Sequence, residues 1–173
     1  MSVVVNVLVN VPNHRIRLVP FFADLVHEHH GDFDSILDLG CGVLQKIWHQ
    51  RWGNRYEGFD NRDTVGADYI GDACDLSRFE SNSRDVITSW STIEHVKHPY
   101  MMLEEMIRVS NGTVIITTDS TQHDKDGDPS HIYSWTLKTF KQLLTLAHVD
   151  NKVYLCSINK PNDIMVGVIY NCK

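Results

Sequence analysis

The feature of this sequence that most constrains its fold is an alternation of short apolar runs with longer stretches of helical periodicity. The runs expected to be strands are 35–39, 56–60, 68–72, 85–90, 113–118, 152–158 and 164–170. The stretches expected to be helices are 20–30, 44–52, 99–109 and 137–147. Strands that alternate with helices predict a mostly parallel sheet covered on both faces, because each parallel connection needs a crossover.

The two ends of the chain depart from this alternation. The last two strands are separated only by residues 159–162, which predicts an antiparallel hairpin at one edge of the sheet. At the start, five valines alternate from Val3 to Val11 and predict a further strand. We therefore expect one Rossmann-like, doubly wound α/β domain over 1–173, with about seven sheet strands. Residues 1–19 would form an N-terminal strand or extension, and 20–173 would form the core.

Composition limits the environment and the partners of the chain. Of 173 residues, 42% are hydrophobic and 22% are charged, which is typical of a soluble globular domain. The net charge of −6 argues against nucleic acid as the partner, since phosphate-binding domains carry a basic surface. Four cysteines without a Cys-x-x-Cys pair favour the reducing cytoplasm, and no apolar stretch approaches a membrane span.

A glycine turn follows the first strand of the expected core. The sequence Asp38-Leu39-Gly40-Cys41-Gly42 ends that strand and leads directly into a helix. Two glycines let the backbone turn tightly and approach a ligand without side chains in between. Ligands of such sheets bind at the carboxyl ends of the strands, so this turn is a candidate binding loop.

Two acidic residues end the next two expected strands. Asp60 lies 20 residues after Gly40 and could accept both hydroxyls of a ribose. Asp72 ends the following strand and could accept the amino group of an adenine. Either aspartate alone could simply cap a turn or helix, but two in succession after a glycine turn favour a nucleoside site.

The binding loop lacks the features that hold phosphate. A dinucleotide fingerprint requires a third glycine where this chain has Gln45, and no Gly-Lys-Ser/Thr follows as in a P-loop. A nucleoside without phosphate therefore fits best, and S-adenosylmethionine is such a ligand. Gln45 also disfavours a nicotinamide oxidoreductase, because the dinucleotide cofactor of such an enzyme requires the third glycine.

These motifs together resemble the class I S-adenosylmethionine-dependent methyltransferases, especially the small type-11-like group. The similarity runs from about residue 20 to 170 and includes the stretch Asp85–Val96, which resembles the family's fourth motif, a strand followed by residues that line the methyl-transfer site. The resemblance implies that the loop backbone lies near the methionine tail, that two acids hold ribose and adenine, and that Ser89 and Trp90, at the end of the strand 85–90, lie beneath the methionine or acceptor side. The implied cofactor-binding residues are Asp38, Gly40, Cys41, Gly42, Asp60, Asp72, Ala73, Ser89 and Trp90.

Two departures from the family pattern affect the expected site. Leu44 stands where the family often has a further glycine, which makes the loop bulkier near the methionine tail. Residues 61–67 are too few for the usual crossover helix between the second and third strands. We expect that face of the sheet to be bare or covered by another chain, which, together with the valine strand, suggests a homo-oligomer.

The ten histidines do not predict a metal site. His27, His29 and His30 lie near an expected helix end, where histidine interacts favourably with the helix dipole. No helical His-x-x-x-His pair with a third ligand is visible in the sequence. His95, in the pair Glu94-His95, is the one candidate for a general base. It could equally fix the loop after the fourth strand, since methyl transfer can proceed by approximation and orientation alone.

The sequence therefore predicts an enzyme that transfers the methyl group of S-adenosylmethionine by in-line displacement. The acceptor is expected to be a small molecule or a protein, and the polar segment 119–134 is expected to contact it. The alternative function is that of a partner or regulatory subunit that binds the cofactor without catalysing transfer.

Overall fold

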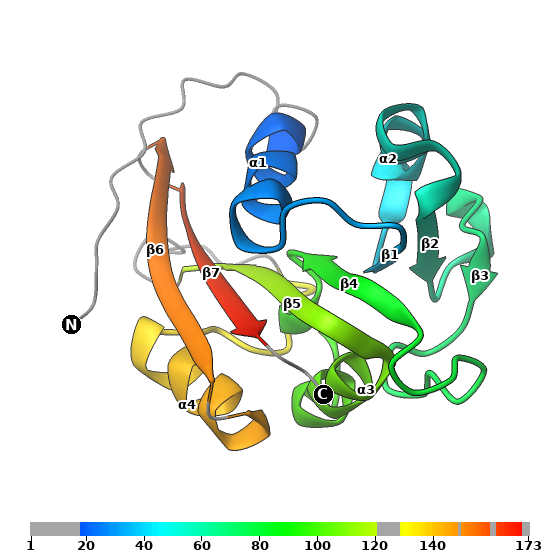
Figure 1. Ribbon diagram of the computed structural model, residues 1–173. Helices are drawn as coiled ribbons and strands as arrows, with labels where there is room; N and C mark the ends of the chain where they lie inside the picture. The colour runs from blue at the N-terminus through cyan, green and yellow to red at the C-terminus, as the bar shows by residue number, and fades with distance from the viewer. Residues whose placement is uncertain (1–17, 121–128, 149, 160–161, 171–173) are drawn as a thin grey trace.

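The computed structural model describes residues 18–120, 129–148, 150–159 and 162–170, and its centre is a seven-stranded sheet (Figure 1). The strand order is β3-β2-β1-β4-β5-β7-β6. The strands are β1 Ile36–Leu39, β2 Tyr56–Asp60, β3 Tyr69–Ile70, β4 Arg84–Trp90, β5 Ser110–Asp119, β6 Asn151–Asn159 and β7 Asn162–Tyr170. Strands β1 to β5 pair in parallel, whereas β7 is antiparallel to both of its neighbours. The predicted Rossmann-like sheet with its antiparallel edge is confirmed; the predicted valine strand lies outside the described residues.

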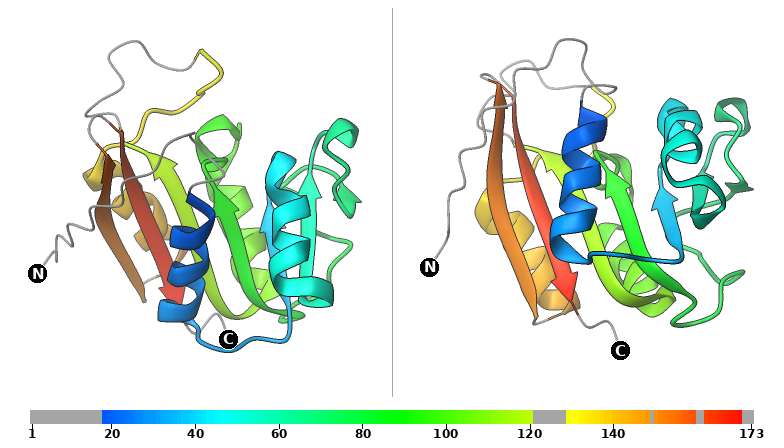
Figure 2. Two further views of the ribbon diagram at one scale, coloured as in Figure 1. Left: turned by 90° about the horizontal axis from the view of Figure 1, so that it is seen from above. Right: turned by 45° about the horizontal axis from the view of Figure 1, so that its top comes forward.

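Helices cover both faces of the sheet, as the alternation predicted. Helices α1 Val19–His29 and α2 Gln45–Trp52 lie on one face, and α3 Pro99–Val109 and α4 Leu137–Ala147 lie on the other (Figures 1 and 2). Each face has its own cluster of buried apolar side chains. Within the described ranges, no helix is long and apolar enough to cross a membrane.

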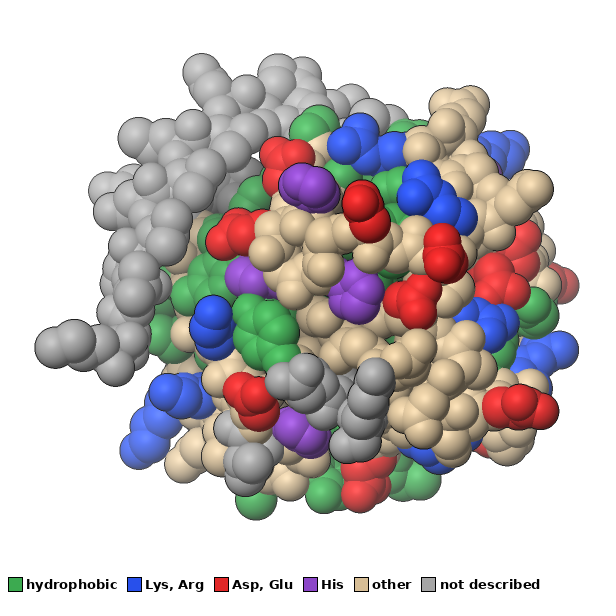
Figure 3. All heavy atoms as spheres, viewed as in Figure 1, with side chains coloured by type: hydrophobic (Ala, Val, Ile, Leu, Met, Phe, Trp, Pro, Cys, Tyr) green, Lys and Arg blue, Asp and Glu red, His purple; other side chains and the backbone are tan. Residues whose placement is uncertain are grey.

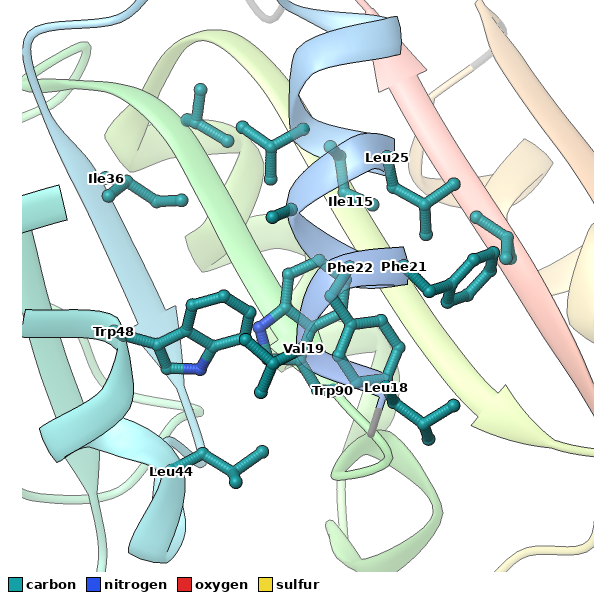
Figure 4. Close-up of a cluster of buried hydrophobic side chains, with 14 of the residues drawn as sticks. Leu18, Val19, Phe21, Phe22, Leu25, Ile36, Leu44, Trp48, Trp90 and Ile115 are labelled. Carbon is teal, nitrogen blue, oxygen red and sulfur yellow. The ribbon is translucent and has the colours of Figure 1, made fainter. Parts of the chain in front are cut away.

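Aromatic side chains dominate the core beneath α1 and α2. The ring of Trp90, at the end of β4, stacks on Phe22 of α1 with centroids 4.3 Å apart and an interplanar angle of 16°. The Trp48 ring of α2 lies 6.2 Å from the Trp90 ring (Figure 4). Offset stacking of this kind favours a fixed packing of the two helices on the sheet.

The connection between β2 and β3 is reduced, as its short length predicted. Its only helical turn among the described residues is the 3₁₀ turn η4 Asp63–Val65. Gln45 is buried at the start of α2, and its side-chain amide donates to the carbonyls of Val65 and Gly66. Gln45 thus braces the short connection, and Ile70 of β3 remains 44% exposed. Strand β3 has two residues rather than the five predicted.

The C-terminal end of α1 is joined to the antiparallel edge by histidine. The His29 Nε2 atom lies 2.6 Å from the Tyr154 hydroxyl of β6, and its Nδ1 atom lies 2.8 Å from the Tyr170 hydroxyl of β7. Burial lowers the pKa of His29 below its ordinary value. The neutral ring therefore connects three elements, which is a structural role.

Candidate active site

A cavity of about 800 Å³ opens at the carboxyl ends of four parallel strands. Its walls include Gly40 after β1, Asp60 at the end of β2, Asp72 after β3 and Thr92 after β4. The strand order changes direction between β1 and β4, so the cavity lies at the switch point where open α/β sheets bind ligands. Its volume is within the range of about 300–1,000 Å³ common for small-molecule sites.

The glycine turn is held against the end of β2. The N–H groups of Gly40 and Cys41 both donate to the Phe59 carbonyl, at 2.8 and 3.1 Å. Gly40 has a φ of +75° and Gly42 a φ of +53°, a conformation that strongly favours glycine. A Cβ atom on Gly40 would overlap the Thr92 side chain. The turn therefore needs glycine both for its backbone angle and for the close approach of Thr92.

The Asp60 carboxylate is fully hydrogen-bonded inside the protein. Its Oδ2 atom accepts from the Gly42 N–H at 3.0 Å and from Arg62 Nη2 at 3.1 Å. Its Oδ1 atom accepts from the Arg62 N–H at 3.0 Å and from Arg62 Nε at 2.9 Å. Burial alone would raise the pKa of Asp60, but these hydrogen bonds outweigh it and hold the pKa below its ordinary value. Asp60 is therefore an ionised acceptor at the cavity wall.

The second predicted acid lies on the neighbouring strand end. Asp72 is exposed and lines the cavity together with Ala73. One of its carboxylate oxygens, Oδ1, accepts the N–H of Cys74 at 2.9 Å, which fixes the turn after β3. Asp60 and Asp72 thus face one cavity, as expected for residues at adjacent parallel strand ends.

Five predicted cofactor residues are outside the cavity lining, namely Asp38, Cys41, Gly42, Ser89 and Trp90. Gly42 contributes indirectly, because its N–H donates to the Asp60 carboxylate. Asp38 is buried, and its carboxyl group accepts from the Tyr56 and Thr88 hydroxyls at 3.0 and 2.9 Å. Burial raises the pKa of Asp38 to about 7. The other three are buried Cys41, whose thiol pKa is raised by burial, buried Ser89, and Trp90 in the core beneath α1.

Several residues of the cavity wall were not assigned a role from the sequence, and three of them adjoin the predicted cofactor residues. Arg62 pairs with Asp60, and Ser91 and Thr92 follow β4 directly. Ser91 has a φ of +48°, which is uncommon for a residue other than glycine and often marks a functional site. The only sequence signal for these residues was their position just beyond two strand ends, where ligands bind.

The far end of the cavity is formed by two segments fastened to each other. The carbonyl of Glu94, in the 3₁₀ turn η5 Ile93–His95, accepts the N–H groups of Ile132 and Tyr133 at 2.8 and 3.0 Å. The His95 Nδ1 atom lies 3.1 Å from the Ser130 carbonyl oxygen and 3.3 Å from the Ser130 hydroxyl. His95, Ser130 and Ile132 all line the cavity. This part of the predicted acceptor segment is at the cavity, while residues 121–128 are outside the described ranges.

Comparison with known proteins gives the class of this chain. The methyltransferase domain family matches residues 37–116, which include the glycine turn, both acids and the stretch after β4. A search of curated proteins found no match.

Solved structures share the fold. A SAM-dependent methyltransferase from Archaeoglobus fulgidus has a TM-score of 0.68 at 14% identity, covering 87% of this chain and 92% of that one. The plantazolicin methyltransferase BamL, solved with a substrate analogue and S-adenosylhomocysteine, gives 0.66 at 15% identity, with 90% and 84% covered. A chain from the complex of the Haloferax volcanii Trm112 activator with a methyltransferase gives 0.60 at 16% identity, with 94% and 99% covered. At these identities, the likeness is one of fold.

The fold, the cavity at its switch point and the methyltransferase domain match over residues 37–116 together support a class I S-adenosylmethionine-dependent methyltransferase, as the resemblance implied. The residues present fit its cofactor, because glycine leaves room for the Thr92 side chain at Gly40 and because Asp60 and Asp72 line one cavity. No phosphate-binding loop interrupts this wall of the site, in keeping with a nucleoside lacking phosphate.

Proposed function

We propose that this protein transfers a methyl group from S-adenosylmethionine to a small-molecule or protein acceptor by in-line displacement. The observation that carries the proposal is the cavity that joins the glycine turn, Asp60 and Asp72 at one end to His95 and Ser130 at the other. S-adenosylmethionine supplies a methyl group already activated on a cationic sulfur. The protein then has to bind the cofactor, orient the acceptor and exclude water.

The cofactor end of the cavity is assigned by chemistry. The Asp60 carboxylate is the acceptor for the ribose hydroxyls, and Asp72 with Ala73 holds the adenine. Every accepting position of the Asp60 carboxylate is taken by Gly42 and Arg62, so ribose binding requires the guanidinium to move aside. The Arg62 side chain is 57% exposed, so its guanidinium can turn into solvent while the ribose hydroxyls replace its hydrogen bonds to Asp60.

The acceptor end is assigned to η5 and the segment 129–133. His95 is the side chain placed to contact the acceptor, because it lines the cavity while its Nδ1 atom is held at Ser130. Ile132 adds an apolar wall and Lys97 a positive charge beside it. A cavity of this size, bounded on both sides, accommodates a small molecule or an extended peptide side chain rather than a duplex.

Surface charge supports the same acceptor classes. On the face shown in Figure 3, acidic and basic side chains are interspersed rather than segregated into a basic patch. The net charge of −6 opposes a polyanionic partner. A neutral or cationic acceptor is therefore proposed over nucleic acid.

Two measurements test the proposal together. Calorimetry should detect binding of S-adenosylhomocysteine, and incubation with methyl-labelled S-adenosylmethionine and a panel of phenols, amines, thiols and peptides should give labelled product. Binding without turnover on any acceptor would favour the alternative, a catalytically inactive partner subunit. That alternative is kept because the chain is small and has only a 3₁₀ turn where a crossover helix between β2 and β3 is usual. Absence of both binding and turnover in folded protein would refute the proposal.

A further inference from the structure

A buried carboxyl group lies behind the acceptor end of the cavity. Glu94 is 1% exposed, and among the described residues neither of its carboxylate oxygens has a partner at full hydrogen-bond geometry; the nearby Thr118 hydroxyl acts on its pKa but likewise makes no such bond. Burying a carboxylate without compensation is costly, so native proteins pair such groups with hydrogen-bond donors or with metal ions. The side chain of Glu94 therefore lacks a partner of one of these kinds.

Two imidazoles lie next to this carboxylate. The donor atoms of Glu94, His95 and His131 all lie within 4.8 Å of one another. The His95 and His131 rings meet edge to face with their centroids 4.7 Å apart. Both histidines are partly exposed, so the cluster is closed by Glu94 on its inner side and accessible on its outer side.

The hydrogen bonding of His95 prepares it as a ligand. Its Nδ1 atom lies 3.1 Å from the Ser130 carbonyl oxygen and 3.3 Å from the Ser130 hydroxyl, and the tautomer with the proton on Nδ1 donates to the nearer carbonyl. The lone pair is then on Nε2. Histidine ligands of metals are generally oriented in this way, by a carbonyl or carboxylate that binds the other ring nitrogen.

We propose that Glu94, His95 and His131 form a binding site for one divalent transition-metal ion, of the Zn²⁺, Co²⁺ or Ni²⁺ kind. Two imidazoles and one carboxylate, with further positions open, are the donor set of many catalytic sites for such ions. Ligand atoms around one Zn²⁺ lie about 3–3.5 Å apart, given metal–ligand distances of about 2.0–2.2 Å. The three side chains therefore have to draw together by at most about 1–2 Å to hold one ion.

The site was not visible in the sequence because its third ligand is distant along the chain. Glu94 and His95 are adjacent, whereas His131 is brought to them by the bonds from Ile132 and Tyr133 to the Glu94 carbonyl. The same two bonds fix the spacing of the cluster. Because His95 lines the large cavity, an ion held here would face the acceptor and could polarise its nucleophilic atom. This role rests on the proposed function, whereas ion binding itself does not.

The test measures ion binding without cofactor or acceptor. Tag-free full-length protein, stripped with a chelator, is titrated with Zn²⁺ by calorimetry and with Co²⁺ by visible absorption. We expect one ion per chain and a Co²⁺ spectrum of nitrogen and oxygen coordination. His95→Ala, His131→Ala and Glu94→Gln should each weaken binding at least tenfold, and circular dichroism should report that each variant is folded.

Two controls keep the result specific to this cluster. His98→Ala removes a histidine of the same cavity wall that is outside the cluster, and it should leave the affinity within twofold. A triple variant, with Asn at Asp124, Asp126 and Asp128, removes the acidic stretch of 121–128 and should also bind normally. Unchanged affinity in the His95→Ala and His131→Ala variants, or loss of binding in the triple variant, would overturn the proposal.

The result of the ion-binding test can be distinguished from the result of the test of the proposed function. S-adenosylhomocysteine affinity is measured on the same samples, and its value does not depend on the ion. Normal cofactor binding with no ion bound overturns the metal site alone. Ion binding with no cofactor bound overturns the proposed function and leaves the metal site in place.

Discussion

Asp38 and Asp60 stand on neighbouring strands of this sheet, on opposite sides of the glycine turn, and both are almost completely buried. Their ionisation is nevertheless opposite. Burial raises the pKa of Asp38 to about 7, whereas the pKa of Asp60 is lower than normal because Arg62 and two backbone N–H groups bind its carboxylate. Burial acts on both carboxyl groups to raise the pKa, and their partners decide the outcome: two hydroxyl groups offset the effect of burial on Asp38 only in part, whereas a guanidinium and two backbone N–H groups outweigh it at Asp60 and keep that carboxylate ionised. One aspartate serves packing, and the other is available to a ligand.

The largest effect is expected when the interior carboxyl group, that of Asp38, is replaced. Because the pKa of Asp38 is raised, the group contributes stability below pH 4 that is lost as pH rises through about 7, where the folded state must release its proton. The loss amounts to about 4 kcal/mol for a shift of about 3 pKa units. Asp38→Asn keeps a neutral hydrogen-bonding group and should be more stable than the wild type at pH 8.

Urea unfolding of both proteins at pH 4.5 and pH 8 measures this difference. The free energy of unfolding of the variant minus that of the wild type should grow by several kcal/mol between the two values. A difference that is constant with pH would show that Asp38 is ionised in the folded protein. Thr88→Ser, which retains a hydroxyl next to Asp38, is the control and should keep the wild-type pH dependence.

The next largest effect concerns the turn that joins the two aspartates. Gly40→Ala adds a methyl group that overlaps Thr92 at a positive φ, so we expect a loss of about 3 kcal/mol, combining backbone strain with overpacking. Gly31→Ala is the matched control, because Gly31 also has a positive φ, of +86°, but open space around its Cβ position. It should lose only about 1–2 kcal/mol from backbone strain. Equal losses in the two variants, measured by urea unfolding, would contradict the close approach at Gly40.

Replacing Asp60, the carboxylate at the cavity wall, should weaken cofactor binding. Asp60→Ala takes away a charged acceptor for the ribose diol, worth about 1.5–3 kcal/mol, or roughly 10- to 150-fold in affinity. Calorimetry with S-adenosylhomocysteine gives the measurement, and Asp63→Ala, in the nearby exposed turn η4, should change little. A folded Asp60→Ala variant with wild-type affinity would remove Asp60 from the cofactor site.

The smallest effect on cofactor affinity is expected from replacing Arg62, the ion-pair partner of Asp60. Arg62→Ala frees two accepting positions of the Asp60 carboxylate for the ribose, so the variant should bind S-adenosylhomocysteine more tightly, by about 3- to 10-fold, or about 0.7–1.4 kcal/mol. Arg62→Lys keeps the charge but loses the two-point contact, and should lie between the two proteins. Weaker binding by Arg62→Ala would instead mean that the guanidinium contacts the cofactor.

Local patterns were sufficient for much of the fold. Strand β2 and helix α3 have the predicted bounds, and the short connection after β2 carries only the predicted minimal turn. Apolar periodicity and helix-breaking residues act over a few positions, so they can be recognised in the sequence directly. The positions of Gly40, Asp60 and Asp72 at the cavity follow for a related reason, since consecutive parallel strands end at the same edge of a sheet.

Contacts between distant residues were decided only by the tertiary structure. Thr88 and Tyr56 donate to the buried Asp38 carboxyl group, Phe22 holds the Trp90 ring in the core, and the segment 129–133 is bound to the carbonyl of Glu94. The sequence by itself therefore determined the sheet, the binding loop and the class of cofactor, because these depend on the order and spacing of residues. The ionisation of each carboxyl group and the clustering of Glu94 with two histidines depend on burial and on which side chains meet, and packing alone determines these.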